Sequence, residues 1–216
     1  MVNASSTWFA ALITITILVV YELVLMLVQR RGTARLARSA HASLREQWFA
    51  AICEQCGSEI LAVQTLRNSL MSATITASTA VLGLIGTVTL AAPSLHASFG
   101  AGNAISQHFT ARLALELVLM STLFASLVCS VMAVRYFNHA GFIASMPVGS
   151  NERRRSSATG SVYLGRAGVL YSWGLRHLIL VAPILASIVY PWAGPVAAAA
   201  VVLVLASSDQ FTPVPS

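Results

Sequence analysis

The feature that most constrains this chain is a series of apolar runs, each long enough to cross a lipid bilayer. A transmembrane helix needs about 20 mostly apolar residues, because the hydrocarbon core is roughly 30 Å thick. Three runs meet this length, at about 8–28, 70–92 and 113–134. A fourth apolar region, at about 175–208, is too long for one span. The pattern predicts an all-α fold, a polytopic transmembrane bundle of four long helices with a C-terminal hairpin helix.

Composition supports lipid as the surrounding solvent. Hydrophobic residues make up 56% of the chain and charged residues 9%, whereas a soluble domain carries roughly 25% charged residues. We therefore expect one transmembrane domain over residues 1–216, with the lipid bilayer as its partner. The basic residues flank apolar spans and do not gather on one compact face, so we expect no nucleic-acid partner.

The positions of arginine predict the orientation. Arg112 lies between the second and third spans, no arginine precedes the first span, and the others follow the first or the third span. Positive residues favour the cytoplasmic side. Segments 30–69 and 135–174 are therefore expected to be cytoplasmic and the N-terminus outside. A multi-pass protein of a bacterial inner membrane fits this pattern.

The C-terminal apolar region allows two arrangements. Gly194 and Pro195 are typical of one helix ending and another beginning, which favours a hairpin with spans at 175–190 and 195–208 and a cytoplasmic C-terminus. The alternative is one long kinked helix with the C-terminus outside. The hairpin is our prediction.

Both cytoplasmic segments are expected to be helical, with local interruptions. Gly57 predicts a break in the first, after which the helical pattern runs from about Ser58 into the second span. In the second, the stretch 147–160 contains proline, glycine, asparagine and serine, and we expect a mobile loop there.

Polar residues recur every fourth position around the start of the second span. This stripe consists of Gln64, Asn68, Ser72 and Thr76, continued by Thr79. A spacing of four places side chains on one helix face, and lipid cannot satisfy amides or hydroxyls. The stripe therefore predicts either interhelical hydrogen bonding, which we favour, or the lining of a pore. Small side chains of the third span are candidates to face it: Thr122, Ser126 and Ser130.

Glu22 is the one acidic residue inside the first span. A carboxylate at membrane depth is costly and is a functional candidate by default. It is a candidate proton or cation site, or a partner of Arg67 or Arg135 near the same face. Glu116 follows Arg112 by four residues, an ordinary spacing for a helical ion pair.

Catalytic and metal-binding motifs are missing from the sequence. There is no GxSxG, HExxH or phosphate-binding glycine loop. Cys53 and Cys56 have metal or redox spacing, but no further cysteine or histidine pair completes a zinc site, so a helical coincidence is favoured. We predict no catalytic residue, no metal and no cofactor. The arginine triplet Arg153, Arg154 and Arg155 either contacts anionic lipid headgroups or lies in a solvated loop.

The stretch AVQTLRNSLMSATITAST, residues 62–79, resembles a plant and bacterial membrane family catalogued as domain of unknown function 599. The resemblance extends over most of residues 21–206. The family-like positions are Tyr21, Arg45, Trp48, Gln64, Arg67, Asn68, Arg135 and Asn138. His41 departs from the family pattern, as do the two cysteines. The resemblance implies the helical membrane fold and a cytoplasmic C-terminus, and it implies no activity.

These observations favour a non-enzymatic membrane protein that forms homo-oligomers, and a narrow ion or small-solute path is one arrangement that such an oligomer allows. The alternative is a membrane scaffold that binds partners through its basic cytoplasmic segments. A membrane enzyme comes third, because convergent polar groups on the spans are confined to Glu22 and the stripe.

Overall fold

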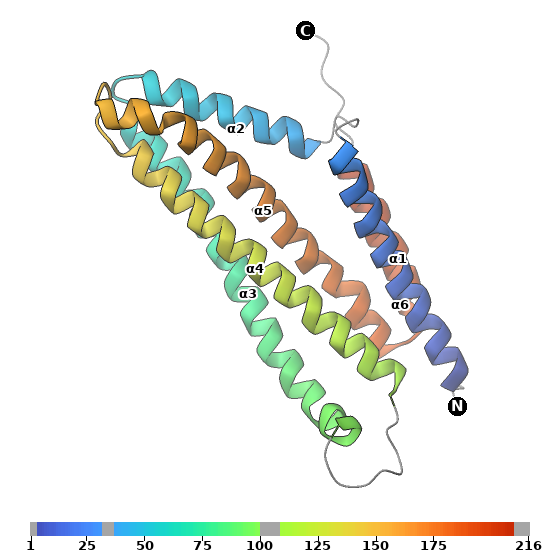
Figure 1. Cartoon of the computed structure of the whole chain (residues 1–216). Coiled ribbons are helices and arrows are strands. Elements are labelled where there is room, and N and C mark those ends of the chain that lie inside the picture. The colour runs from blue at the N-terminus through green and yellow to red at the C-terminus, as the bar shows by residue number, and fades with distance from the viewer. Residues whose placement is uncertain (1–3, 32–36, 100–108, 210–216) are drawn as a thin grey trace. The chain divides into compact units, whose positions relative to one another are not determined.

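The computed structural model describes residues 4–31, 37–99 and 109–209, and every regular element in this part of the chain is an α-helix. Part of the predicted segment 30–69, residues 32–36, lies outside the described residues. The helices, in chain order (Figure 1), are α1 (Ala4–Arg31), α2 (Ala37–Glu54), α3 (Glu59–Phe99), α4 (Ala111–Ala144), α5 (Asn151–Val189) and α6 (Ala193–Asp209).

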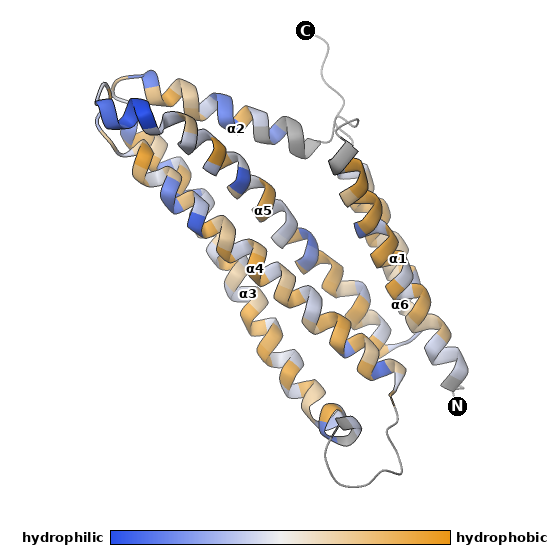
Figure 2. Ribbon diagram, in the orientation of Figure 1, coloured by the Kyte–Doolittle hydropathy of each residue, from blue (hydrophilic) through white to orange (hydrophobic). Residues whose placement is uncertain are grey.

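The helices have the length and composition expected for a membrane protein. Within the described residues, α1, α3, α4 and α5 are long and apolar enough to cross a membrane, and α6 is a shorter apolar helix. Orange, hydrophobic colouring dominates α1, whereas the first turns of α5 are strongly hydrophilic (Figure 2). The all-α prediction is confirmed, and the five predicted spans fall on α1, α3, α4, α5 and α6.

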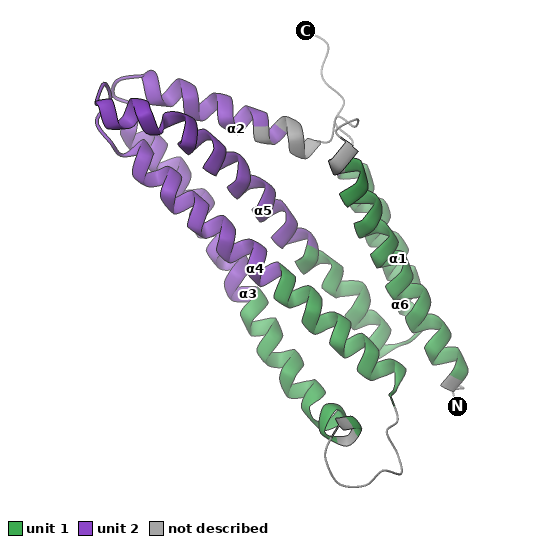
Figure 3. Cartoon of the chain, viewed as in Figure 1, with its two compact units in different colours: residues 1–34, 80–125, 177–208 green, residues 35–79, 126–176, 209–216 purple. Residues whose placement is uncertain are grey.

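The chain divides into two compact units (Figure 3), and α3, α4 and α5 contribute residues to both. Unit 1 contains residues 1–34, 80–125 and 177–208. Its core is aliphatic, with Leu18, Leu119, Ile184 and Leu205 all buried. A side chain added at Gly83 of α3 would come within 2.9 Å of Leu123 of α4, so the absent side chain lets these helices approach closely.

Unit 2 contains residues 35–79, 126–176 and 209–216. Its core includes Phe49 from α2, Leu66 from α3, Phe137 from α4 and Leu164 from α5. The predicted break at Gly57 is confirmed, since its φ is +82° and the chain is not helical between α2 and α3. The predicted long helix that follows is α3, whose 41 residues correspond to about 60 Å at roughly 1.5 Å per residue.

The prediction of a mobile loop over 147–160 is wrong for most of that stretch. Helix α5 begins at Asn151 and continues through Gly160 to Val189. Its start is capped by Ser150, whose side-chain oxygen accepts the backbone N–H of Arg153 at 3.2 Å. Glu152 adds an acidic residue to the first turn, where the helix dipole favours negative charge. Residues 147–160 therefore contain the start of a helix, although their composition is typical of a loop.

The C-terminal hairpin is confirmed. Helix α5 ends at Val189, and α6 begins at Ala193 after a short turn. A side chain at Gly194 would come within 2.4 Å of Ser187 and 2.6 Å of Thr14, so this glycine allows close packing at the turn. Arg176 on α5 contacts the carboxylate of Asp209 at the far end of α6.

Candidate functional site

Glu22 of α1 lies beside His177 of α5 in unit 1. The distance between Glu22 Oε1 and His177 Nε2 is 3.7 Å, and the two side chains are 18% and 16% exposed. Glu22 Oε1 is buried and has no hydrogen-bond partner among the described residues. The geometry therefore brings an acid and a base together, too far apart for a direct hydrogen bond. His177 was not a predicted site residue.

The pair lies in the wall of a pocket of about 330 Å³, which α1, α4 and α5 line. Most of the wall is aliphatic, and its other polar side chains are Ser121 and Thr122 of α4. A volume of roughly 300 Å³ is at the lower end of the range for small-molecule sites. The pocket can therefore hold a small ligand against one carboxylate and one imidazole.

The residues of the polar stripe on α3 differ in their exposure to solvent. Thr76 is 4% exposed, whereas Gln64, Asn68, Ser72 and Thr79 are exposed. The hydroxyls satisfy themselves within the helix: Ser72 Oγ donates to the Asn68 carbonyl at 3.1 Å, Thr76 Oγ1 to Ser72 at 2.9 Å and Thr79 Oγ1 to Ile75 at 2.9 Å. Bonds of this kind remove the need for a partner helix or a pore to satisfy these groups. The amides of Gln64 and Asn68 remain at the surface of unit 2.

The small side chains of α4 pack differently from the expectation. Ser126 Oγ donates to the Gly174 carbonyl of α5 at 2.7 Å. A side chain at Gly174 would also come within 2.5 Å of Ser130 Oγ. Ser126 and Ser130 therefore contact α5, and the prediction that they face the polar stripe of α3 is wrong for these two residues.

Arg153 is a buried structural residue in unit 2. Its side chain is 1% exposed. One guanidinium nitrogen donates to the carbonyls of Ala144 and Met146, just at and beyond the end of α4, and the other donates to Ile52 in the last turn of α2 at 3.1 Å. Helix ends leave carbonyls without intrahelical partners. Arg153 thus joins the ends of two helices to the start of α5.

This position removes Arg153 from the predicted headgroup-binding triplet, because its guanidinium is enclosed by protein. Arg154 and Arg155 are exposed. The sequence alone does not show which of the three arginines is buried. That depends on the rotation of α5 about its axis, which directs Arg153 toward the core.

Helix α2 packs against α5 over three glycines. A side chain added at Gly160 would collide with the Phe49 ring, one at Gly165 with Glu46, and one at Gly168 with Arg45. The contacts run in opposite directions along the two helices, so α2 is antiparallel to this part of α5. Burial lowers the pKa of the Arg45 guanidinium, and Arg45 Nη1 is buried without a hydrogen-bond partner among the described residues.

The other family-like residues are spread over both units. Tyr21 packs against the core of unit 1 and Trp48 against the core of unit 2. Arg67, Arg135 and Asn138 are exposed. The structure does not bring the family-like residues into one cluster.

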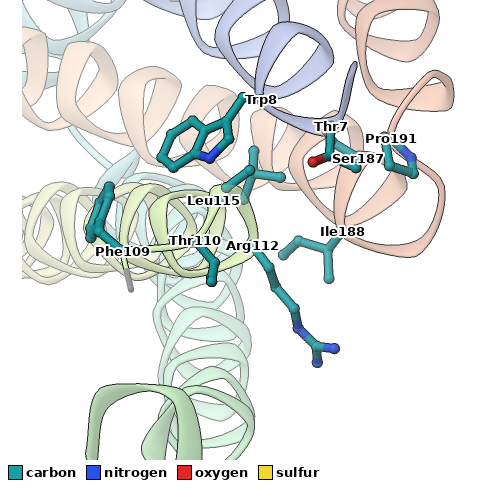
Figure 4. Close-up of a pocket in the computed structure, with 10 residues that line it drawn as sticks. Thr7, Trp8, Phe109, Thr110, Arg112, Leu115, Ser187, Ile188 and Pro191 are labelled. Atoms are coloured by element: carbon teal, nitrogen blue, oxygen red, sulfur yellow. The ribbon is translucent and has the colours of Figure 1, made fainter. Parts of the chain in front are cut away.

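A second pocket of unit 1, of about 540 Å³, is formed by the first turns of α1 and α4 and the end of α5 (Figure 4). The Trp8 and Phe109 ring centroids are 5.7 Å apart. Arg112 extends away from the other labelled side chains, and its Nε donates to Glu116 Oε1 at 2.9 Å. The predicted Arg112–Glu116 ion pair is therefore confirmed. Glu116 is 2% exposed, deeper than its place near the end of a predicted span indicated.

Within the residues that the structure describes, no group of three or more histidine, cysteine, aspartate or glutamate side chains is arranged to hold a metal ion. Cys53 is buried and Cys56 is exposed, and both are free thiols.

Comparison with known proteins adds one match. A family model described as "Protein of unknown function, DUF599" matches residues 9–214, nearly the whole chain. No curated protein and no solved structure matches the chain.

Proposed function

Since the chain belongs to the DUF599 family of proteins of unknown function, we propose a function from its site: a non-enzymatic protein that takes a small ion or solute into the bilayer beside Glu22 and His177. The observation that carries this proposal is the 3.7 Å approach of an acid and a base in the wall of a mostly aliphatic pocket. Ionisable groups at membrane depth are rare, because hydrocarbon disfavours charge, and they mark ion or proton routes.

The proposed topology places the N-terminus outside and the arginine-rich connections in the cytoplasm. Helix α1 then enters from the outside, and Glu22 lies in its cytoplasmic third. The α5–α6 hairpin returns the chain to the cytoplasmic side. Arg154 and Arg155, exposed at the start of α5, support this orientation by the positive-inside rule.

Ion movement into sealed vesicles tests the proposal. Purified protein is reconstituted into liposomes that enclose a pH-sensitive dye, and an acid pulse is applied with and without a potassium diffusion potential. We expect wild-type vesicles to acidify faster than empty ones, and Glu22→Gln to remove the difference. Glu152→Gln, which neutralises an exposed carboxylate in unit 2, serves as the matched control. Equal acidification by wild-type and Glu22→Gln vesicles contradicts the proposal.

Self-association is a second candidate, favoured by the exposed amides of Gln64 and Asn68. Both lie on one face of α3, and a second copy of this helix would offer donors and acceptors to each amide. Interhelical hydrogen bonds of this kind contribute about 1 kcal/mol each or less. Two copies joined in this way would bury these amides and could enclose a narrow path.

Oligomer mass in mild detergent tests this candidate. The double variant Gln64→Leu, Asn68→Leu is expected to shift the particle toward the monomer. Ser72→Ala is the control, because its hydroxyl is already bonded within α3. Oligomers that persist unchanged in the double variant exclude this face as the interface.

A further inference from the structure

We infer that the pocket beside Glu22 binds a small organic cation with N–H donors, a primary or secondary ammonium on an apolar frame. The inference rests on the proposed function and names the class of ligand for the same site.

The hydroxyl groups in the pocket wall offer lone pairs and no hydrogen. Ser121 Oγ donates to the Leu117 carbonyl at 2.9 Å, and Thr122 Oγ1 donates to the Val118 carbonyl at 2.8 Å. A hydroxyl has one hydrogen to donate, so each of these has given its hydrogen to its own helix. A ligand that meets Ser121 or Thr122 is therefore favoured if it donates.

The carboxylate has the same preference and adds charge. Glu22 Oε1 is buried without a hydrogen-bond partner among the described residues, and its 3.7 Å separation from His177 Nε2 exceeds hydrogen-bonding distance. An ionised carboxylate only accepts hydrogen bonds. An ammonium in the pocket neutralises the charge of the partly exposed Glu22 carboxylate, whereas an anion or a carbonyl does not.

The rest of the wall favours an apolar frame. It consists of Ile15, Leu18, Val19, Leu23, Met26, Val118, Ala125 and Leu180. Contact with aliphatic side chains stabilises a ligand in proportion to the apolar surface removed from water. A fully hydrated metal ion gains nothing from such a wall.

Calorimetric titration of the purified full-length protein in detergent micelles tests the ligand class with three probes of similar shape: benzylammonium, benzyl alcohol and benzoate. We expect benzylammonium to bind most tightly. Glu22→Gln should weaken its binding at least about tenfold, as hydrogen bonds to charged groups typically do. Glu152→Gln should leave it unchanged. A thermal melt of Glu22→Gln establishes that the variant is folded.

Benzyl alcohol or benzoate binding as tightly as benzylammonium overturns the inference, and so does benzylammonium binding that is indifferent to Glu22→Gln in a folded variant. If Glu22-dependent acidification of vesicles persists while benzylammonium does not bind, the ligand class is wrong and the proposed function stands. If Glu22→Gln alters neither acidification nor binding, both fail.

Discussion

Arg176 of α5 donates a hydrogen bond to the carboxylate of Asp209 at the end of α6. The two side chains are 8% and 12% exposed, so the ion pair is largely withdrawn from solvent. Asp209 is the one charged residue after the turn, and its contact with Arg176 joins the two ends of the hairpin. A single kinked helix would have carried Asp209 far from Arg176.

Removal of Asp209 is expected to weaken the hairpin. Asp209→Ala removes a hydrogen bond between two charged groups that are largely buried, and the loss of a hydrogen bond to a charged group typically costs about 1.5–3 kcal/mol. We expect a lower melting temperature in detergent and faster proteolysis after α5. Ser208→Ala is the neighbouring control, since Ser208 is exposed and bonds within its own helix. A melting temperature equal to that of the wild type would show that the pair does not hold α6.

Arg153 and Arg155 are expected to differ sharply in their effect on stability. Arg153→Ala leaves the carbonyls of Ala144 and Met146 without the Arg153 donor, and each unsatisfied buried group costs about 1–3 kcal/mol. Arg155→Ala removes an exposed charge and should change stability by no more than about 0.5 kcal/mol. Thermal melts of both variants test this contrast. Equal losses would contradict the capping role of Arg153.

The exposed arginines of α5 are expected to favour anionic membranes. The double variant Arg154→Gln, Arg155→Gln removes two exposed charges and leaves the buried Arg153 in place. Each charge near an anionic surface contributes about 1 kcal/mol. Native mass spectrometry that counts retained anionic against zwitterionic lipids should show fewer anionic lipids on the variant. An unchanged ratio of anionic to zwitterionic lipids would contradict the binding of lipid headgroups by Arg154 and Arg155.

Packing of α2 depends on the absence of a side chain at Gly160. The added methyl group of Gly160→Ala would meet the buried ring of Phe49, and overpacking of a core typically costs about 1–3 kcal/mol. Faster hydrogen exchange over residues 43–53 is the expected result. Gly141→Ala, on α4 of the same unit, has open space at that point and should leave the exchange of α2 unchanged. Similar exchange in both variants would mean that α2 tolerates displacement from α5.

The sequence was sufficient for the helices, because the signals involved are local. Apolar length predicted the spans, and the turn chemistry at Gly57 and at Gly194–Pro195 predicted the breaks that the structure contains. The start of α5 was missed because residues 147–160 have a loop-like composition, although Ser150 caps the helix that begins at Asn151.

The contacts within the candidate site could not be predicted from the sequence in the same way. Glu22 was identifiable as a carboxylate inside an apolar run, but its neighbour His177 is on a helix far along the chain. Sequence offered Arg67 and Arg135 as partners from their expected side of the membrane, and only tertiary packing selects the histidine. Gly165 and Gly168 did carry a signal, since a spacing of three residues places both on one helix face.

Labelling of Glu22 with carbodiimides tests the central claim most directly, because these reagents react with carboxyl groups and differ in their solubility in lipid. In membranes, we predict that dicyclohexylcarbodiimide modifies Glu22 and that a water-soluble carbodiimide does not. Peptide mass spectrometry reads each carboxyl separately, and the exposed Glu152 should show the opposite preference. Modification of Glu22 by the water-soluble reagent at the rate of Glu152 would contradict a carboxylate held in an apolar pocket within the bilayer.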